Sequence, residues 1–456
     1  MRAKRNTIDM SQGPLLGKLL LFAAPLALTY LLQLAFVAAD MVVIGRWGSP
    51  TSLAAIGATT PLLGLLINVV VGISTGSNIL AAQYYGAKES KKLTRLVHTT
   101  VAIAIISGIA VAILGWCLLE FLVKVTDVPA ESQKLSMLYL AILFAGVPFQ
   151  IIYNFVCAIL RAVGDTRAPL YFLCLAGTLN VVLNLILVIC FKMDVAGVAL
   201  ATIASHLLSA YLALRRLYKS RGATRLLPRN IRVDMSSLGG IIKLGLPAGL
   251  QSGCFSISNI VVQSGINSFG VAAVAGMTAG FNVEMLLYAL VFALHHTAIA
   301  SVGQNYGAGK YKRLIKCINI CMALSLAINL IFGLLMSYFS PALISIFSTD
   351  KEVIRYGVMR AHLMFTVYFL IAFMDTSSGA LRGLGNSLLP AISTLVGTCI
   401  LRIAWMKVIF PLYNTMESLL IVYPISWALV AALNMLVLFL ACRKLSGQPQ
   451  NSITRL

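Results

Sequence analysis

Long apolar stretches recur along the whole chain, and this recurrence constrains the fold more than any other feature. Of the 456 residues, 59% are hydrophobic and only 11% are charged, whereas soluble domains carry about 25% charged residues. Since a helix needs about 20 apolar residues to cross a bilayer, the sequence predicts an all-α integral membrane protein. The twelve predicted transmembrane helices cover residues 16–45, 53–82, 94–123, 133–160, 169–191, 195–218, 238–263, 271–303, 314–346, 355–381, 387–411 and 419–442.

The basic residues are distributed unevenly between the loops. The formal net charge is +21, and basic clusters fall in alternate loops, around residues 88–95, 161–167, 215–232 and 310–316. Cytoplasmic loops of membrane proteins carry an excess of Lys and Arg. We therefore expect a multi-pass protein of the cell (inner) membrane, with these loops and both termini in the cytoplasm. This pattern accounts for the positive charge, so nucleic acid is not an expected partner.

Sequence motifs of the first half return in the second half. AAQYYGA at residues 81–87 recurs as VGQNYGA at 302–308, and LRAVGDTRAP at 160–169 recurs as LRGLGNSLLP at 381–390. Both offsets are 221 residues (302 − 81 and 381 − 160). Each half then holds six predicted spans, and an even number implies parallel repeats related by an axis along the membrane normal. Many secondary transporters are built from such repeats, although a duplicated scaffold without transport remains an alternative.

The repeat also predicts where the chain divides. A basic linker separates the two sets of six spans. We expect an N-lobe at residues 1–218, a basic cytoplasmic linker at 219–236, a C-lobe at 237–443 and a cytoplasmic tail at 444–456. A single chain contains both lobes, so a monomer is expected.

Three acidic residues interrupt the apolar spans. They are Asp40, Glu284 and Asp375. A carboxylate in the hydrocarbon layer costs about 2.5 kcal/mol or more, so such residues usually face a cavity or a partner. Removal from water favours the protonated form of a carboxyl group, and we interpret the three as candidate cation-coupling residues. Pro25 precedes Asp40 in the same predicted span and permits a kink that could gate it.

Amide and hydroxyl side chains extend the first of these candidate sites. Asn180 and Asn184 are four residues apart in one predicted helix and therefore share a face. Amides both donate and accept hydrogen bonds. With Asp40 and Thr202 they could line a polar pocket for the substrate. Hydrogen bonding between helices for packing alone is the alternative.

The third acid differs from its counterpart in the repeat. At the offset of 221 residues, Asp375 corresponds to Asn154, so an acid in one half replaces an amide in the other. This asymmetry indicates a special role for the acid, and Asn154 is a candidate cavity residue. The alternative is that Asp375 holds helices together by pairing with Arg382 or Arg402.

No residue pattern indicates a metal, a cofactor or a catalytic centre. The nine cysteines form no CxxC pair, and adjacent His295 and His296 point to different faces of one helix, so no metal site is expected. Nucleotide and hydrolase motifs are absent from the sequence. A membrane-embedded enzyme would need the histidines and acids to converge at one depth, which their separation disfavours.

Taken together, these motifs resemble the multidrug and toxic compound extrusion (MATE) family. The resemblance runs from about residue 13 to 443 and rests on Pro25 and on the segments AADMVVIGRWG, AAQYYGAKES, ILRAVGDTRAP, LNVVLN, VGQNYGAGK and ALRGLGNSLLP. It implies a V-shaped pair of six-helix lobes. It also implies a secondary antiporter that exports cationic or amphipathic drugs or metabolites, chiefly small organic cations, in exchange for inward H⁺ or Na⁺.

The resemblance carries over unevenly to individual residues. Asp40 matches the family's first-helix acid and Asn180 matches an N-lobe asparagine, but Asn184 stands where many members carry Asp. One branch has a seventh-helix Glu near the position of Phe255, and this chain lacks it. Glu284 looks like an acid that other branches carry in the eighth helix, and it could take over the cation-binding role of the missing seventh-helix Glu. A flippase for a lipid-linked precursor, with a cavity lined by Arg and Lys, is the alternative function.

Overall fold

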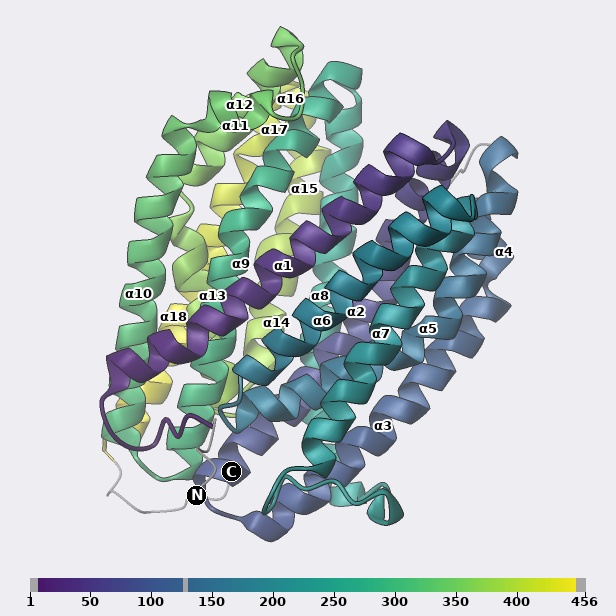
Figure 1. Ribbon diagram of the computed structural model, residues 1–456. Coiled ribbons are helices and arrows are strands. Elements are labelled where there is room, and N and C mark those ends of the chain that lie inside the picture. Colours follow the sequence, from purple (N-terminus) through teal and green to yellow (C-terminus); the bar gives the residue numbers. More distant parts are fainter. Residues whose placement is uncertain (1–6, 126–129, 448–456) are drawn as a thin grey trace. The chain divides into compact units, whose positions relative to one another are not determined.

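A computed structural model of the protein describes residues 7–125 and 130–447, and all regular elements in these ranges are helical (Figure 1). Residues 448–456 of the predicted C-terminal tail lie outside the described residues. The first half of the chain contains α1 (Leu15–Trp47), α2 (Pro50–Gly86), α3 (Ser90–Cys117), α4 (Leu119–Val125), α5 (Ala130–Ala162), α6 (Arg167–Asn184), the π-helical segment η1 (Leu185–Cys190), α7 (Asp194–Tyr218) and the short 3₁₀ turn η2 (Pro228–Asn230).

The second half repeats this order with more interruptions. It contains α8 (Met235–Asn267), α9 (Val271–Gly307), α10 (Tyr311–Tyr338), α11 (Ser340–Ser345), α12 (Lys351–Thr366), α13 (Phe369–Gly383), α14 (Leu388–Thr394), the π-helical segment η3 (Leu395–Ile400), α15 (Leu401–Val408), α16 (Phe410–Tyr413), α17 (Met416–Leu420) and α18 (Val422–Ser446). All twelve predicted apolar segments are thus helical.

Most of these helices are long and apolar enough to cross a membrane. Among the described residues, 10 helices meet this description, or 11 if α12 and α13, which are bent by 57° at their junction, form one broken span. The remaining predicted segment, 238–263, lies in α8, whose sequence is rich in Ser, Gly, Asn and Gln. The multi-pass membrane architecture is therefore established, and the count of 12 spans stays a prediction.

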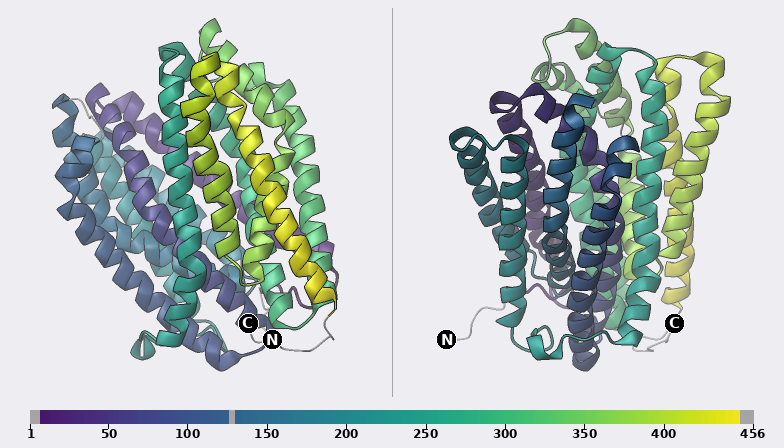
Figure 2. Two further views of the ribbon diagram at one scale, coloured as in Figure 1. Left: turned by 180° about the vertical axis from the view of Figure 1, so that it is seen from behind. Right: turned by 90° about the vertical axis from the view of Figure 1, so that its right-hand side faces the viewer.

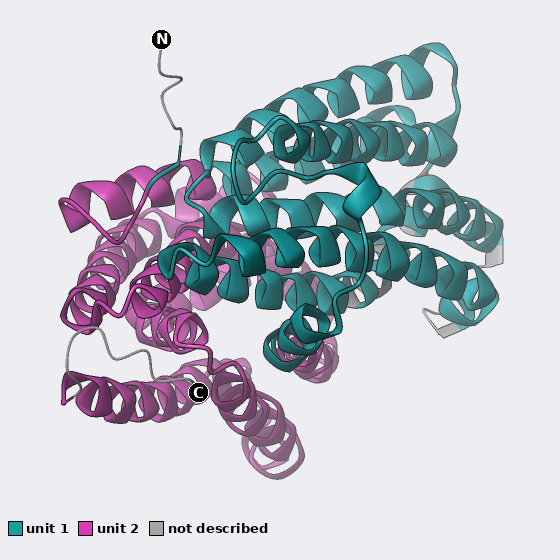
Figure 3. Cartoon of the chain, turned by 90° about the horizontal axis from the view of Figure 1, so that it is seen from below, with its two compact units in different colours: residues 1–8, 28–249 teal, residues 9–27, 250–456 magenta. Residues whose placement is uncertain are grey.

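The chain forms two compact units, and two helices contribute to both (Figure 3). Unit 1 comprises residues 1–8 and 28–249, and unit 2 comprises residues 9–27 and 250–456. The division falls two residues after Pro25 in α1 and two residues after Pro247 in α8. The units therefore do not coincide with the two sequence repeats, because the first half of each proline-containing helix belongs to the unit formed mainly by the other repeat.

In unit 1, α5 is the central helix and packs against α2, α3 and α7. The first half of α8 approaches α2 so closely that glycine is required on both helices. A Cβ at Gly76 would lie 2.8 Å from the backbone nitrogen of Gly245, and one at Gly249 would overlap the backbone of Val69. Small residues allow such close backbone contact between membrane helices.

Unit 2 repeats this plan with α9 and α13 at its centre. α9 packs against α10, α12 and α13, and α13 packs against α18. In the views of Figure 2, the yellow α18 lies beside the yellow-green α14–α15 segment, in agreement with their contacts. The bend between α12 and α13 corresponds in the repeat to the surroundings of Pro148, where α5 is continuous.

Side chains form hydrogen bonds to the backbone of the segments that precede α1 and α8. In unit 2, the Met10 N–H donates to Gln304 Oε1 (2.8 Å), and Arg313 Nε donates to the Met10 carbonyl (3.0 Å). In unit 1, the Leu227 N–H donates to His98 Nε2 (3.1 Å), and the Asp234 N–H donates to Thr99 Oγ1 (3.0 Å). Backbone groups outside the helices are thus satisfied in equivalent ways in the two repeats.

Candidate functional site

Asp40 forms a direct pair with an asparagine of another helix in unit 1. Asn184 Nδ2 donates to Asp40 Oδ1 (2.5 Å) and also approaches Asn180 Oδ1 (3.3 Å). Asn184 is fully buried, whereas Asp40 is partly exposed. The structure therefore brings together three of the predicted site residues, one carboxylate and two amides, at the contact between α1 and α6.

Local packing explains how α1 and α6 meet at this point. Gly177 precedes Asn180 and Asn184 on one face of α6, and a Cβ there would overlap the ring of Phe36. Phe36 lies one helical turn before Asp40, so seating its ring on Gly177 directs the carboxylate towards Asn184. The π-helical segment η1 begins directly after Asn184, and single π-turns inside helices are frequent at functional sites.

The Asp40 pair carries no compensating positive charge among the described residues, whose ion pairs do not include it. The Asp40 carboxylate is stabilised by a hydrogen bond from the Asn184 amide, and this bond is charge-assisted and short. Asn184 Oδ1 is buried and accepts no hydrogen bond within the described ranges. An acid with a neutral partner can take up a proton or a monovalent cation without first breaking an ion pair.

Two predicted cavity residues donate hydrogen bonds to backbone carbonyls of their own helices. Thr202 Oγ1 donates to the Val198 carbonyl on α7 (2.9 Å), and Asn154 Nδ2 donates to the Gln150 carbonyl on α5 (2.9 Å). Neither side chain forms a hydrogen bond to Asp40 in the part of the chain that the structure describes. A role in lining a cavity remains a prediction for both, as does the role of Pro25 in gating.

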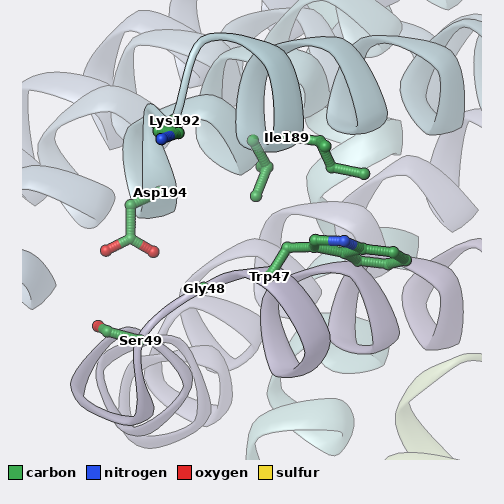
Figure 4. Close-up of a pocket in the computed structure, with 7 residues that line it drawn as sticks. Trp47, Gly48, Ser49, Ile189, Lys192 and Asp194 are labelled. Atoms are coloured by element: carbon green, nitrogen blue, oxygen red, sulfur yellow. The ribbon is translucent and has the colours of Figure 1, made fainter.

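A pocket of about 310 Å³ lies near one end of unit 1, and the sequence did not point to it (Figure 4). Its lining residues are Trp47, Gly48, Ser49, Val188, Ile189, Lys192 and Asp194. Asp194 accepts a hydrogen bond from Ser52 Oγ. Asp40 is not among its lining residues, whereas Val188, which belongs to an apolar cluster with Val43 and Ile44, lines the pocket.

Glu284 of α9 is paired with a buried arginine of α12 in unit 2. Arg360 Nη2 lies 2.8 Å from Glu284 Oε2, and the two side chains are 5% and 8% exposed. Of the two predicted surroundings of Glu284, a cavity or a partner, the structure shows a partner, Arg360. An acid neutralised by a buried guanidinium is less available to a coupling cation than Asp40.

Asp375 lies on α13, and the ion pairs formed between described residues do not include it. The guanidinium of Arg382 donates to Gln251 Oε1 (2.5 Å) and lies 3.5 Å from His295 Nε2. One oxygen of the Asp375 carboxylate, Oδ2, is buried without a hydrogen bond among the described residues. His295 contacts the backbone carbonyl of Asp375 (2.8 Å), which is a structural contact and does not bring the two side chains together as an acid–base pair.

Residues 7–125 and 130–447 contain no group of three His, Cys, Asp or Glu side chains arranged to hold a metal ion. Asp40 is bonded to the amide of Asn184, and Glu284 is paired with the guanidinium of Arg360. Proton or monovalent-cation binding at one carboxylate is the chemistry that this arrangement supports.

Comparison with known proteins identifies the family. The chain matches the MatE family over residues 25–186 and 247–406. It is 27% identical over 384 residues to the probable multidrug resistance protein YoeA of Bacillus subtilis, covering 82% of each chain. It is 27% identical over 399 residues to the probable multidrug resistance protein NorM of Thermotoga maritima, covering 86% of this chain and 85% of that one.

A solved structure shows the same fold. A MOP superfamily transporter from Pyrococcus furiosus superimposes with a TM-score of 0.91 at 20% identity, covering 98% of this chain and all of that one (100%). The two family matches fall one in each sequence repeat and together span most of the chain. This protein therefore belongs to the MatE family of membrane transporters.

Proposed function

We propose that this protein is a secondary active antiporter that exports small cationic or amphipathic molecules in exchange for inward H⁺ or Na⁺. The observation that carries the proposal is the Asp40–Asn184 pair, in which a carboxylate within an apolar span is bonded to an amide and forms no ion pair with any described residue. Ionisable residues inside membrane proteins commonly mark ion and proton pathways. Relatives described as probable multidrug resistance proteins support the export of small molecules.

The pair offers a way for cation binding to change the structure. With Asp40 ionised, Asn184 donates its amide N–H to the carboxylate. Once Asp40 is protonated, its hydroxyl becomes a donor, and Asn184 Oδ1, which is buried without a partner among the described residues, is available to accept. Reversal of the amide would then accompany proton uptake. Coupling requires only that the two arrangements differ in their affinity for the substrate.

The remaining assignments follow the same proposal. The distribution of basic loops supports a location in the cell membrane with both termini in the cytoplasm. The two sequence halves act as the lobes of an alternating-access transporter within a monomer. Pro25 and Pro247 lie next to the points where α1 and α8 pass from one compact unit to the other, so we assign them as the positions at which these helices bend.

The experiment that tests this function is transport by purified protein in liposomes. Ethidium movement is followed by fluorescence while a H⁺ gradient or a Na⁺ gradient is imposed separately, and an ionophore that collapses the gradient serves as the control. We expect one gradient to drive ethidium movement and the ionophore to stop it. Movement that continues after the gradient is collapsed, or that equals the leak of protein-free liposomes, would contradict the proposal.

A further inference from the structure

The part of α8 that belongs to unit 2 carries a polar stripe on its surface. Ser252, Ser256, Asn259, Gln263 and Asn267 are spaced by three or four residues and therefore lie on one helical face. Asn259, Gln263 and Asn267 are exposed. Gln263 Nε2 donates to Asn267 Oδ1 (3.0 Å), so two of the amides are linked along the stripe.

A second stripe beside it is apolar. Leu250, Ile257 and Ile260 are 55%, 51% and 61% exposed, which is the surface expected against lipid tails. Exposed amides are costly in hydrocarbon because their donors and acceptors lose water without gaining partners. The polar stripe of α8 is therefore suited to face water, and the apolar stripe is suited to face lipid.

Behind the polar stripe lies Arg402, a buried cation on α15. Its side chain is 2% exposed. Arg402 Nη1 donates to Asn259 Oδ1 (3.1 Å), and Nε and Nη2 donate to Ser426 Oγ (3.1 and 2.9 Å). These three bonds use three of the five guanidinium N–H groups. The buried guanidinium is thus bonded to Asn259, an exposed residue of the polar stripe.

The charges around Arg402 do not balance. Its guanidinium lies 4.3 Å from the centroid of the Tyr423 ring, and that of Arg360 lies 5.4 Å from the same ring. Glu284 is already engaged by Arg360. Ion pairs within the described ranges do not include Arg402. Of these two buried arginines, Arg360 has a carboxylate partner and Arg402 has none among the described residues, so the positive charge of Arg402 is uncompensated there.

We propose that Arg402 and Asn259 form a subsite for an anionic group, a carboxylate or phosphate, of an amphipathic substrate. Burying a guanidinium without a counter-charge is costly. An oxyanion that replaced Asn259 would supply the missing negative charge. It would also accept hydrogen bonds from the two remaining N–H groups of Arg402, in the bidentate geometry that a guanidinium favours. The inference rests on the proposed export function and adds to its substrate class amphipathic molecules that carry an anionic group, zwitterions included.

The test uses two dyes that differ at one group. Rhodamine 110 carries a free carboxylate, and rhodamine 123 is its methyl ester. Binding of each dye to the purified, detergent-solubilised protein is measured by fluorescence anisotropy. We expect Arg402→Gln to weaken rhodamine 110 binding by about tenfold, the scale of one lost charge-assisted hydrogen bond, and to leave rhodamine 123 binding unchanged. Arg402→Lys, which keeps the charge, should lose less.

Two further variants guard against an effect on folding. Asn259→Asp places a carboxylate beside Arg402, so it should weaken rhodamine 110 binding while keeping or raising the unfolding temperature. Arg355→Gln removes an exposed arginine that pairs with Glu352 and should change neither dye. Equal loss of both dyes in Arg402→Gln, or unchanged rhodamine 110 binding in Asn259→Asp, would overturn the subsite.

A lipid headgroup phosphate has the same chemistry, so binding is repeated in nanodiscs with and without phosphatidylglycerol. Competition by phosphatidylglycerol that disappears in Arg402→Gln would assign the site to lipid and overturn the substrate assignment. Equal rhodamine 110 binding in the two nanodiscs supports it. If the dyes are not discriminated but gradient-driven ethidium export persists, the subsite fails while the antiporter function stands.

Discussion

The acids of the two units differ in the partner to which each carboxylate is bonded. In unit 1, Asp40 is held by the amide of Asn184. In unit 2, Glu284 is held by the guanidinium of Arg360. The offset of 221 residues relates Glu284 to Leu63 and places a valine, Val261, opposite Asp40. The two repeats thus share the helical scaffold and its glycine-containing turns, whereas the acids inside the spans have no acidic counterpart in the other half.

This difference assigns different tasks to the acids. A carboxylate with an amide partner can gain and lose a cation at modest cost, whereas a buried ion pair must be broken first, at a cost of about 3–5 kcal/mol. We therefore expect Asp40 to dominate coupling and Glu284 to hold α9 against α12. Each of the following predictions tests this division or another difference between the repeats.

The largest effect is expected from Asp40→Asn. The substitution keeps the shape of the side chain and removes its ability to bind a cation, so gradient-driven ethidium export should fall to the rate of protein-free liposomes. The unfolding temperature should change little, since Asn can still accept the bond from Asn184. Glu417→Gln, which neutralises an acid in the first turn of α17, is the matched control and should transport normally.

Glu284→Gln should have the next largest effect, and the effect is on stability. It leaves Arg360 buried without its counter-charge, which costs about 3–5 kcal/mol. Replacing both residues with methionine removes the charge and its partner together, so the double variant should regain most of the stability, measured by thermal unfolding in detergent. A stable double variant that no longer exports ethidium would show that Glu284 takes part in coupling after all.

The glycines of the two repeated turns provide a sharper comparison. Gly164 and Gly385 both have φ of +89°, so alanine at either position costs about 1–3 kcal/mol in backbone strain. At Gly164, a Cβ would also lie 2.6 Å from the backbone nitrogen of Ile8. Gly164→Ala should therefore lower the unfolding temperature more than Gly385→Ala. Equal shifts would mean that the Ile8 contact contributes nothing.

Sequence patterns predicted the parts of this structure that depend on local spacing. Apolar runs predicted the helices, and the spacing of Asn180 and Asn184 predicted their shared face, in agreement with the bond between them. The Glu284–Arg360 pair was not predicted, because the two residues are 76 positions apart and only the packing of α9 on α12 brings them together. Arg360 gave no signal beyond its place near the end of a predicted span.

Sequence patterns also did not predict the interruptions within helices. The bend between α12 and α13 has no proline or glycine at its centre, where Val367 and Tyr368 stand. The passage of α1 and α8 between the compact units depends on contacts far apart in the chain. Pro25 and Pro247 were visible, but a proline shows where a helix is able to bend and does not show which neighbours each half contacts.

The smallest effect is expected where the segment before α8 joins unit 1. Thr99 Oγ1 accepts the N–H of Asp234 (3.0 Å), and Thr99→Val removes this acceptor at a cost of about 1 kcal/mol. Gln304→Leu removes the side-chain oxygen that accepts the N–H of Met10, and Met10 is fully buried. Because an unpaired buried N–H cannot turn to water, Gln304→Leu should lower the unfolding temperature more than Thr99→Val. The reverse order would show that the linker, rather than the N-terminal segment, is the more firmly bound of the two equivalent segments.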